Sequence, residues 1–481
     1  MLDATLLIDG APRTTAQTFT RRHPVTGDVM TTAAAASEAD AVAAADAAAA
    51  AFVSWSQTGP SARRALISRA ADLLRERTND LVAAMMNETG ASEAWSRFNI
   101  HLTEGIMREA AAATTRVAGE VLATDKPGCL SLAIRQPIGV CLAIAPWNAP
   151  LILGMRSIIW PLACGNSVVL KASELCPGTH RLLGEILIAA GFPKGTVNVV
   201  MNAPEDAASI VATLIAHKAV RHINFTGSSH TGRIIAMEAA RHLKPVLLEL
   251  GGKAPLLVLD DADLDAAVRA AAFGAFMHQG QICMSTERVV VDRRVADGFA
   301  EKFAVKAGSL TAGDPRTSNA PLGSLIGIQA ADRVEALIDD AVTKGAKRLS
   351  GGARNGTIMD ATVLDHVTPQ MRIYHEESFG PVACIVRAEN DEDAIRIAND
   401  TEYGLAASVY SRDVSRALGV ARRIESGICH VNGPTVQDEA PVPFGGVKAS
   451  GYGKFGGIDG LNAFTTLRWL TIESQEPHYP F

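Results

Sequence analysis

Cys283 is the residue of this chain whose surroundings best suit a nucleophile. It lies in "GQICMSTER", directly after a helix predicted over residues 263–278. Glycine, glutamine and hydroxyl side chains surround it, and such polar surroundings with nearby backbone amides favour the thiolate, the form that attacks a carbonyl carbon. Cys141 and Cys384 lie inside apolar strands, so we expect them to be buried core residues. The sequence therefore predicts a cysteine nucleophile at position 283.

Two further side chains supply what a thiolate needs in order to process a carbonyl compound. Glu249, in "LLELGGK", ends an apolar strand before two glycines, and a partly desolvated carboxylate has a raised pKa and can act as a general base toward water. Asn148, in "PWN", is an amide donor for an oxyanion. Structural alternatives remain open for both, with Glu249 capping the turn at 251–252 and Asn148 serving as an ordinary Asx-turn residue.

Two strand ends offer groups that suit a dinucleotide. "FTGSSHTG" (225–232) follows a strand and enters a helix, so Gly227 and Ser228 place backbone N–H groups at a positive helix end. "LKASE" places Lys171 and Glu174 at the carboxyl end of another strand, where Glu174 can accept ribose hydroxyls and would repel a 2′-phosphate. The alternatives are an ordinary N-cap at Ser228 and an exposed Lys–Glu pair at a helix start.

The glycine spacing G-x-G-x-x-G, which is typical of dinucleotide-binding loops, occurs once, as "GYGKFG" at 451–456. That motif binds a pyrophosphate when it follows a strand and opens a helix inside a βαβ unit. Only about 25 residues remain after it, which leaves little room for such a unit. The turn at residues 227–228, which does follow a strand and enter a helix, is therefore better placed for a dinucleotide than this loop.

Helices and strands alternate through most of the chain, which predicts parallel sheets covered by helices. Residues 37–56 and 61–87 begin a helical N-terminal third, with Ser37 and Ser61 as predicted N-caps. A first α/β series follows, with strands in 139–148, 166–174, 195–202, 222–228 and 245–252. A second has helices in 263–278, 330–344 and 391–399 and strands in 288–292, 381–388 and 404–411. Without a linker between the two series, we expect two α/β domains that share a cleft.

The composition indicates a globular protein with large cores. The 481 residues are 48% hydrophobic and 20% charged, enough for two or three domains. The formal net charge of −6 offers no basic surface for nucleic acid or anionic lipid, and no apolar run is long enough to span a membrane. The start of the chain shows no secretory signal. Seven cysteines without C-x-x-C pairs fit a reduced cytoplasmic protein without disulfides or a metal site.

Seven motifs in fixed order make the chain resemble the NAD(P)-dependent aldehyde dehydrogenase superfamily over nearly its whole length. They are "PWN" (146–148), "LKASE" (170–174), "FTGS" (225–228), "LELGGK" (248–253), "GQICMSTER" (280–288), "EESFGP" (376–381) and "PFGGVKASGYG" (443–453). The chain looks most like bacterial aromatic-aldehyde members, which act on salicylaldehyde, vanillin or benzaldehyde. "QGQICMSTER", "NGPTVQDEA" and the terminal "YPF" carry that narrower similarity.

The resemblance implies a role for each site residue. Cys283 would form a thiohemiacetal with the aldehyde, Asn148 and the Cys283 amide would hold the oxyanion, and Glu249 would activate the water that hydrolyses the thioester. Lys171 counts with the catalytic residues and also, beside Glu174, with the contacts to the adenosine ribose. The implied cofactor is NAD, preferred over NADP because of Glu174. The implied cofactor contacts are Trp147, Lys171, Glu174, Gly227, Ser228, Glu377 and Phe379.

The resemblance also implies the fold, which is α/β with a Rossmann-like parallel-sheet cofactor domain, an α/β catalytic domain and a small β oligomerisation ribbon. We expect the NAD-binding domain at 1–114 and 139–249, the catalytic domain at 250–462, and the ribbon at 115–138 and 463–481. The ribbon would build a homodimer or homotetramer. By the same resemblance, "GYGKFG" belongs to a loop near the substrate mouth and the subunit contacts.

Arg156 is the residue whose position and charge indicate the class of substrate. If a helix begins near Pro150, Arg156 lies eight residues beyond Asn148 and roughly on its face, given about 3.6 residues per turn. Arg156 would then reach the substrate channel, with Leu153 one turn nearer, and suit a phenolate or a carboxylate. A structural ion pair is the equally open alternative. By position in the family, the further channel walls are Trp95, Val436 and Phe444.

These apolar walls favour aromatic aldehydes. The sequence therefore predicts NAD-dependent oxidation of an aldehyde of the salicylaldehyde, vanillin or benzaldehyde type to its carboxylate. A semialdehyde dehydrogenase of the succinic semialdehyde type is the first alternative, because Arg156 also suits a carboxylate. A CoA-acylating relative is disfavoured by Glu249, which acylating enzymes do not need. A non-catalytic NAD-binding protein is disfavoured by the intact set of Cys283, Glu249 and Asn148.

Overall fold

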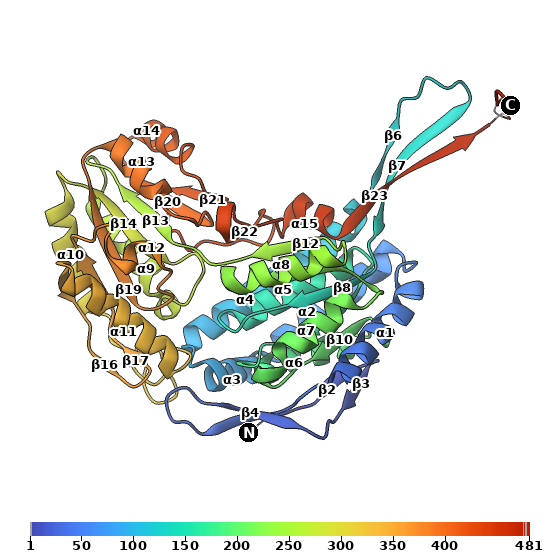
Figure 1. The fold of residues 1–481 in the computed structure, drawn as a ribbon, viewed down its shortest axis with the longest axis horizontal. Helices are drawn as coiled ribbons and strands as arrows, with labels where there is room; N and C mark the ends of the chain where they lie inside the picture. Colours follow the sequence, from blue (N-terminus) through green and yellow to red (C-terminus); the bar gives the residue numbers. More distant parts are fainter. Residues whose placement is uncertain (1, 475, 477–478) are drawn as a thin grey trace.

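Two α/β bodies and a projecting arm of strands make up the fold (Figure 1). The computed structural model describes residues 2–474, 476 and 479–481. The first body is built around an eight-stranded sheet, the second around a seven-stranded sheet, and the arm is a three-stranded sheet. The expected α/β fold class is confirmed by the long parallel runs in the two larger sheets.

The eight-stranded sheet has the order β22-β12-β11-β8-β9-β10-β2-β3, and its five central strands run parallel. Every residue of β8 and β9 is buried, because helices cover both faces and leave no side for polar residues. The strands are β2 (Leu6–Ile8), β3 (Ala11–Arg13), β8 (Val140–Ile144), β9 (Ser167–Lys171), β10 (Val197–Val200), β11 (Val220–Thr226), β12 (Val246–Glu249) and β22 (Gly451–Tyr452).

Two groups of helices cover this sheet. Helices α1, α7 and α8 adjoin one another on one face, and α5 and α6 adjoin on the other, with α2, α3 and α4 behind them. The bounds are α1 (Glu38–Trp55), α2 (Pro60–Glu76), α3 (Thr78–Thr89), α4 (Glu93–Ala113), α5 (Pro150–Ala163), α6 (Pro177–Ala189), α7 (Ala207–Ala216), α8 (Ser229–Arg241) and α15 (Gly457–Ala463). Over the described ranges, no helix is long and apolar enough to cross a membrane.

The helix starts test the predicted caps. Ser37 caps α1 as predicted, in a reciprocal capping box with Asp40. The prediction for Ser61 is wrong, because α2 begins at Pro60 with Gly59 as its N-cap, and proline's fixed φ and missing N–H suit the first helical position. The single helix predicted over 61–87 is two helices, α2 and α3, which meet at Arg77.

The strand order opens a crevice between β8 and β11. The chain runs outward through β8, β9 and β10, then returns to add β11 and β12 on the other side of β8. In such open parallel sheets, the loops at the carboxyl ends of the two central strands diverge at this reversal, and ligands bind between them. The loops after β8 and after β11, which begin at residues 145 and 227, therefore bound this crevice.

The seven-stranded sheet has the order β15-β18-β19-β14-β13-β20-β21 and is parallel except for β15. Alternate residues of β13 supply separate cores on the two faces, Leu257 on one and Leu256 and Val258 on the other. The strands are β13 (Ala254–Val258), β14 (Thr286–Asp292), β15 (Lys347–Ser350), β18 (Thr362–Asp365), β19 (Val382–Ala388), β20 (Ala406–Tyr410) and β21 (Ile428–Val431). The helices are α9 (Leu264–Phe276), α10 (Ala296–Gly308), α11 (Ile328–Thr343), α12 (Arg372–His375), α13 (Asp391–Asn399) and α14 (Val414–Ala421).

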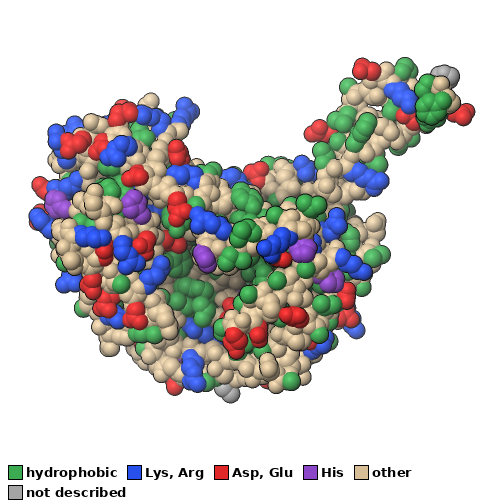
Figure 2. Space-filling view, in the orientation of Figure 1, with side chains coloured by type: hydrophobic (Ala, Val, Ile, Leu, Met, Phe, Trp, Pro, Cys, Tyr) green, Lys and Arg blue, Asp and Glu red, His purple; other side chains and the backbone are tan. Residues whose placement is uncertain are grey.

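The arm joins two segments that lie far apart in the sequence. Strands β6 (Gly119–Leu122), β7 (Cys129–Pro137) and β23 (Thr465–Glu473) pair antiparallel in the order β23-β7-β6. Figure 1 shows the arm extending away from the first body, and Figure 2 shows apolar side chains on its surface. The expected ribbon segment 463–481 also includes residues 475, 477 and 478, which lie outside the described residues.

The N-terminal region differs from its helical prediction. Residues 2–34 form β1 (Leu2–Ala4), β2, β3, β4 (Thr18–Arg22) and β5 (Val29–Ala34) before the first helix. Strands β1, β5 and β4 form a small sheet, whereas β2 and β3 extend the edge of the eight-stranded sheet. In β4, alternate residues are exposed and half-buried, a period-two pattern typical of a strand. A two-stranded sheet of β16 (Arg354–Asn355) and β17 (Ile358–Met359) completes the second body.

The "GYGKFG" stretch begins with an edge strand. Gly451 and Tyr452 form β22, which pairs antiparallel with β12 and places Gly451 opposite Glu249. Gly451 has φ +110°, and a Cβ there would lie 2.0 Å from the carbonyl oxygen of Leu248. The glycine therefore lets the C-terminal chain approach the end of the strand that carries Glu249.

We predict that Gly451→Ala lowers the free energy of unfolding by at least about 2 kcal/mol, because alanine there meets both an unfavourable backbone region and a steric clash. Thermal unfolding measures the change. Gly419→Ala is the matched control, because Gly419 lies in α14 with no atom within 4 Å of the added Cβ and should gain about 0.5–1 kcal/mol. Equal unfolding midpoints for the Gly451 variant and the wild type would contradict the assigned role.

Candidate active site

Two cavities meet at Cys283. The first, called the apolar cavity below, has a volume of about 210 Å³ and lies among α4, α5, the end of α9 and the loop after β21. The second, the strand-end cavity, has a volume of about 300 Å³ and lies at the crevice between β8 and β11. Cys283, Asn148 and Leu153 line both cavities. A molecule in either cavity therefore has access to the same sulfur and the same amide.

An unusual turn presents Cys283. Helix α9 ends at Phe276, and His278, Gln279 and Gly280 then adopt φ values of +49°, +56° and +69°. Residues with a Cβ, such as His278 and Gln279, seldom adopt a positive φ, because the Cβ then lies too close to the backbone. Such strained conformations are concentrated at functional sites. A Cβ on Gly280 would lie 2.1 Å from the carbonyl oxygen of Gly380, so only glycine fits there. This turn directs the following loop, with Cys283, to the junction of the cavities.

The expectation that polar neighbours favour the Cys283 thiolate is wrong. Burial raises the pKa of the Cys283 thiol well above its ordinary value, and the nearby carboxylates of Glu249 and Glu377 raise it further. The polar neighbours bond elsewhere: the Ser285 hydroxyl donates to the carbonyl of Gly280, and the Gln281 side-chain oxygen accepts from the backbone of Ile326. The surroundings of Cys283 therefore favour the thiol over the thiolate.

Glu249 ends β12 as a buried carboxylate. Neither of its oxygens has a hydrogen-bond partner within the described residues, and burial raises its pKa well above the ordinary value, with Arg156 and Lys454 opposing that rise. A Cβ on Gly445 would lie 2.7 Å from a Glu249 oxygen, so the glycine leaves room for the carboxyl group. The alternative of a turn cap is wrong, because the N–H of Gly252 donates to Glu377 at 2.9 Å. Glu249 is absent from the lining of both cavities, but it lies near enough to Cys283 for its charge to raise the pKa of the thiol.

The Gly251–Gly252 turn connects the two sheets at the site. A Cβ on Gly252 would lie 2.3 Å from the Cys283 carbonyl oxygen, and one on Gly251 would lie 2.5 Å from a Glu377 oxygen. Gly252 therefore lets the turn after the strand of Glu249 pack directly against the Cys283 loop, and Gly251 leaves room for the Glu377 carboxyl group. Burial, with the neighbouring charge of Glu287, raises the pKa of Glu377 to about 7.

Asn148 is held toward Cys283 from the first body. Its side-chain amide donates to the carbonyl of Gln281 at 2.9 Å, and its own carbonyl accepts from the indole of Trp95 at 3.0 Å. These contacts cross between distant segments, so the Asx-turn alternative is wrong. Because an amide nitrogen carries two hydrogens, one remains for a ligand oxygen beside Cys283.

The strand-end cavity contains most of the predicted cofactor contacts. Trp147, Gly227, Ser228, Glu377 and Phe379 all line it, and the rings of Trp147 and Phe379 meet edge to face at 5.8 Å. Ser228 is the N-cap of α8, as its structural alternative proposed, with its hydroxyl accepting from the Thr231 amide at 3.2 Å. The remaining free amides of that first turn still suit an anion, so the two interpretations are compatible.

Lys171 and Glu174 stand apart from this cavity. They are absent from its lining and form an ion pair with each other at the end of β9, where Glu174 also accepts from the Asn202 amide at 2.9 Å. Lys171 is buried and Glu174 half-buried, so the alternative of an exposed pair is wrong. β9 is the neighbour of β8, which places the pair along the same carboxyl edge of the sheet.

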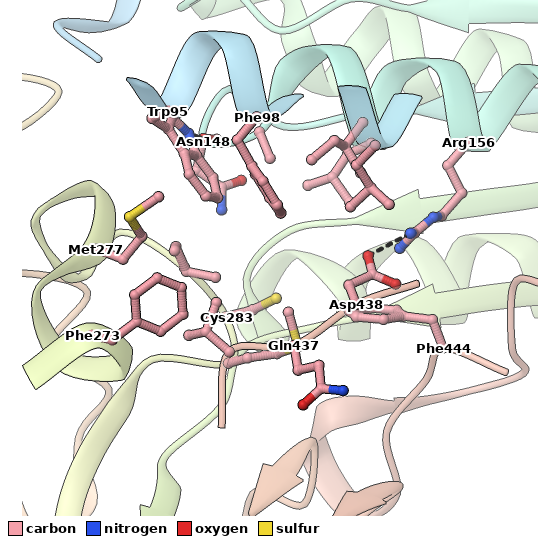
Figure 3. A pocket seen from close by; sticks show the side chains of 17 residues that line it. Trp95, Phe98, Asn148, Arg156, Phe273, Met277, Cys283, Gln437, Asp438 and Phe444 are labelled. Atoms are coloured by element: carbon pink, nitrogen blue, oxygen red, sulfur yellow. Dashed lines mark hydrogen bonds and ion pairs between the residues drawn. The ribbon is translucent and has the colours of Figure 1, made fainter. Parts of the chain in front are cut away.

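The apolar cavity contains every predicted substrate residue, Trp95, Leu153, Arg156, Val436 and Phe444 (Figure 3). Sequence reasoning missed Phe98 and Leu102, although their spacing of three and seven residues from Trp95 marks one face of α4. It also missed Phe273, Met277, Ile282, Met284, Gln437 and Asp438. The last two lie in the irregular segment after β21, where no periodicity signals a cavity wall.

Arg156 fulfils both of its sequence interpretations. It lies in α5 and lines the apolar cavity, and its Nη2 lies 2.5 Å from Oδ2 of Asp438. Both side chains are buried, with 4% and 8% of their surfaces exposed, and the Arg156 guanidinium stacks 4.7 Å from the Phe444 ring centre. Figure 3 shows the pair on the cavity wall to one side of Cys283.

Comparisons with known proteins give a consistent result. A family model described as "Aldehyde dehydrogenase family" matches residues 12–470. A vanillin dehydrogenase from Pseudomonas sp. (strain HR199 / DSM 7063) is 57% identical over 482 residues, covering 100% of both chains. The crystal structure of a salicylaldehyde dehydrogenase from Pseudomonas putida G7, complexed with salicylaldehyde, matches with TM-score 0.98 and 48% identity, covering 100% of both. A benzaldehyde dehydrogenase (NAD(+)) from Pseudomonas putida is 38% identical over 460 residues, covering 95% of this chain and 94% of the relative.

We predict that Glu249→Gln stabilises the protein increasingly as pH rises. Because the folded-state pKa of Glu249 lies above its unfolded value, the native state keeps this proton where the unfolded chain has lost it. The contribution of Glu249 to the free energy of unfolding of the wild type is therefore fully present below the unfolded pKa of about 4.5. It declines as pH rises toward the folded pKa. The glutamine does not titrate, so its advantage should reach about 1–3 kcal/mol near pH 8 and vanish near pH 4.

Thermal unfolding of both proteins between about pH 4 and pH 9 measures this difference. Glu402→Gln is the matched control, because it makes the same replacement at an exposed glutamate paired with Arg233, where the change in stability should stay within about 1 kcal/mol. A difference for Glu249→Gln that is flat with pH, or that falls as pH rises, would contradict the buried, unpaired carboxylate.

Proposed function

The chain belongs to the aldehyde dehydrogenase family, and from that premise we propose that it oxidises aromatic aldehydes of the vanillin and salicylaldehyde type to carboxylates, with NAD as the hydride acceptor. The observation that carries the proposal is the junction at Cys283 and Asn148, where an aromatic-lined cavity meets a second cavity at the carboxyl edge of a parallel sheet. An aldehyde and a dinucleotide can then reach one sulfur from two sides.

The apolar cavity supports an aromatic substrate by size and by lining. An apolar protein cavity of about 150 Å³ binds benzene, so about 210 Å³ accommodates one substituted ring. The rings of Trp95, Phe98, Phe273 and Phe444 offer edges and faces for such a ring. The names of the vanillin, salicylaldehyde and benzaldehyde relatives point to the same substrate class.

Cys283, Asn148 and Glu249 have separate roles in the proposed reaction. The Cys283 thiol gives up its proton to solvent as its sulfur bonds to the carbonyl carbon, and the Asn148 amide donates to the oxygen that becomes negative. Bound NAD supplies the acceptor for the hydride that leaves this carbon. Water then attacks the resulting thioester while the Glu249 carboxylate takes its proton. The carbon–sulfur bond breaks, Glu249 passes that proton to the leaving sulfur, and the acid and the thiol are released.

The strand-end cavity suits NAD. The free amides at the start of α8 fit a pyrophosphate, and Glu377 and the Trp147–Phe379 pair lie on the side of Cys283, where a nicotinamide riboside would sit. Glu174, at the end of β9, would accept the adenosine ribose hydroxyls beside Lys171. Its negative charge disfavours the 2′-phosphate of NADP. Trp147, Gly227, Ser228, Glu377 and Phe379 would hold the dinucleotide together with that pair.

The assembly and the compartment complete the proposal. We assign residues 1–114 and 139–249 to cofactor binding, 250–462 to the catalytic domain, and the arm within 115–138 and 463–481 to a homodimer or homotetramer. The arm exposes Val121, Leu467, Trp469 and Ile472 by more than half of their surfaces, which a second copy would cover. All seven cysteines are free, which fits the reducing cytoplasm.

We predict that kcat/KM is highest for aromatic aldehydes in an initial-rate panel of benzaldehyde, salicylaldehyde, vanillin, succinic semialdehyde and a short aliphatic aldehyde. The free acid should be the product with or without added CoA, because Glu249 activates water. A lead for succinic semialdehyde or the aliphatic aldehyde would contradict the substrate class. A CoA thioester as the main product would contradict hydrolysis.

We predict that Glu249→Gln gives a burst of NADH equal to the enzyme concentration, followed by turnover about 10²–10⁴-fold slower than wild type, because thioester hydrolysis loses its base. Rapid-mixing absorbance measures both phases. Cys283→Ala is the control and should show neither phase while still binding NAD. Wild-type steady turnover in the Glu249 variant would mean that another residue activates the water.

A further inference from the structure

The ion pair of Arg156 and Asp438 is the polar feature of the apolar cavity that the proposed mechanism leaves unused. Arg156 comes from α5 and Asp438 from the segment after β21, 282 residues apart. Their contact is a charge-assisted bond at 2.5 Å, and the Phe444 ring lies 4.7 Å from the guanidinium carbon. Two buried charges on the wall of a cavity with aromatic and aliphatic lining call for a functional explanation, since such a pair contributes little net stability.

The pair is incompletely bonded. Nη1 of Arg156 and Oδ1 of Asp438 are buried and have no hydrogen-bond partner within the described residues. Buried polar atoms in proteins are nearly always paired, so two bonded residues that line the cavity retain one unpaired donor and one unpaired acceptor. A ligand group that accepts from the first and donates to the second would satisfy both atoms.

The charges of Arg156 and Asp438 determine which kind of ligand group can bind to these two atoms. A free arginine would select a carboxylate or a phenolate, but Asp438 already balances the charge of Arg156. An anionic substituent would therefore be repelled by the unpaired Oδ1 of Asp438, whereas a neutral hydroxyl both donates and accepts. A methoxy group accepts only.

We propose that Arg156 and Asp438 together form a recognition site for a neutral phenolic hydroxyl on the ring of the aromatic aldehyde, and that the pair excludes carboxylated aldehydes. This inference rests on the proposed function and narrows its substrate class to hydroxylated benzaldehydes. It also sets aside a semialdehyde as the substrate, since a carboxylate tail would have to displace Asp438 from Arg156.

The test compares kcat/KM for hydroxybenzaldehydes and methoxybenzaldehydes with the substituent at the ortho, meta and para positions. In assays below the pKa of the phenol, the two substituents affect the reactivity of the aldehyde similarly at the meta and para positions, and comparison of the ratio between variants removes the intrinsic difference at the ortho position. For the wild type we expect a ratio of about ten or more at one ring position at least, as a hydrogen bond to a charged group provides. Asp438→Asn should lower that ratio about tenfold with almost no change in cavity shape.

Two further variants complete the design. Glu439→Gln removes the same charge at the next residue, which is exposed and does not line the cavity, so its ratio should match the wild type. Since Asp438→Asn leaves a buried guanidinium without its partner and can impair folding, a double variant, Arg156→Met with Asp438→Leu, removes both charges at similar volume and should also lose the ratio. In Asp438→Asn, 4-carboxybenzaldehyde should gain at least about tenfold relative to 4-methoxybenzaldehyde, because Arg156 is released.

Three outcomes would overturn the inference. A wild-type ratio near one at every ring position would show that no hydroxyl is recognised. A ratio retained in both Asp438→Asn and the double variant would show that other residues recognise it. Wild-type activity restricted to non-aromatic aldehydes would overturn the proposed function and this inference together. Oxidation of both hydroxybenzaldehydes and methoxybenzaldehydes, with a kcat/KM ratio that the variants leave unchanged, would overturn the inference alone.

Discussion

The backbone of Gly252 lies against the carbonyl of Cys283, at a separation that leaves no space for a Cβ. This contact joins the two α/β bodies at the reacting atoms, because Gly252 follows the strand of Glu249 and Cys283 follows the last helix before β14. The other features of the site depend on it. Asn148 reaches the same loop through the carbonyl of Gln281, and the two cavities open on either side of the sulfur.

Burial at this junction changes the acid–base properties of both Cys283 and Glu249. The thiol of Cys283 and the carboxyl group of Glu249 both hold their protons to higher pH than they would in water. A carboxylate made more basic in this way is a better proton acceptor, and the cost is a buried acid without a bonding partner. Burial of Glu249 therefore lowers the stability of the folded protein and raises the basicity of the carboxylate, a combination that is common at functional sites.

The sequence predicts most elements of the fold, because the strand and helix patterns of a parallel sheet are local. Helix α13 has the predicted bounds, and the ends of β8 and β11 carry the groups expected there. Ser61 fails as a cap because Pro60 starts the helix one residue earlier. The break at Arg77 depends on packing among α2, α3 and α4 and has no strong signal of glycine or proline.

The structure brings most of the predicted side chains to two adjoining cavities, but it gives some of them environments that the sequence did not predict. Arg156 reaches the cavity because helical periodicity fixes its direction, but its partner Asp438 is 282 residues away and no local pattern connects them. The polar residues around Cys283 suggest an activated thiolate, yet in three dimensions they bond to the backbone and leave the sulfur in a desolvated position. Hydrogen-bond partners and solvent exposure are properties of the tertiary structure, so sequence context alone could not supply them.

Mass spectrometry of enzyme quenched during turnover of an aromatic aldehyde and NAD tests the central claim most directly, since that claim is the transfer of the acyl group through Cys283 at the junction. Peptides covering all seven cysteines are measured in the same sample. The expected result is the acyl mass on the peptide that contains Cys283 and on no other. Acylation of a different cysteine, or full acid production by an enzyme in which Cys283 is blocked, would contradict the claim.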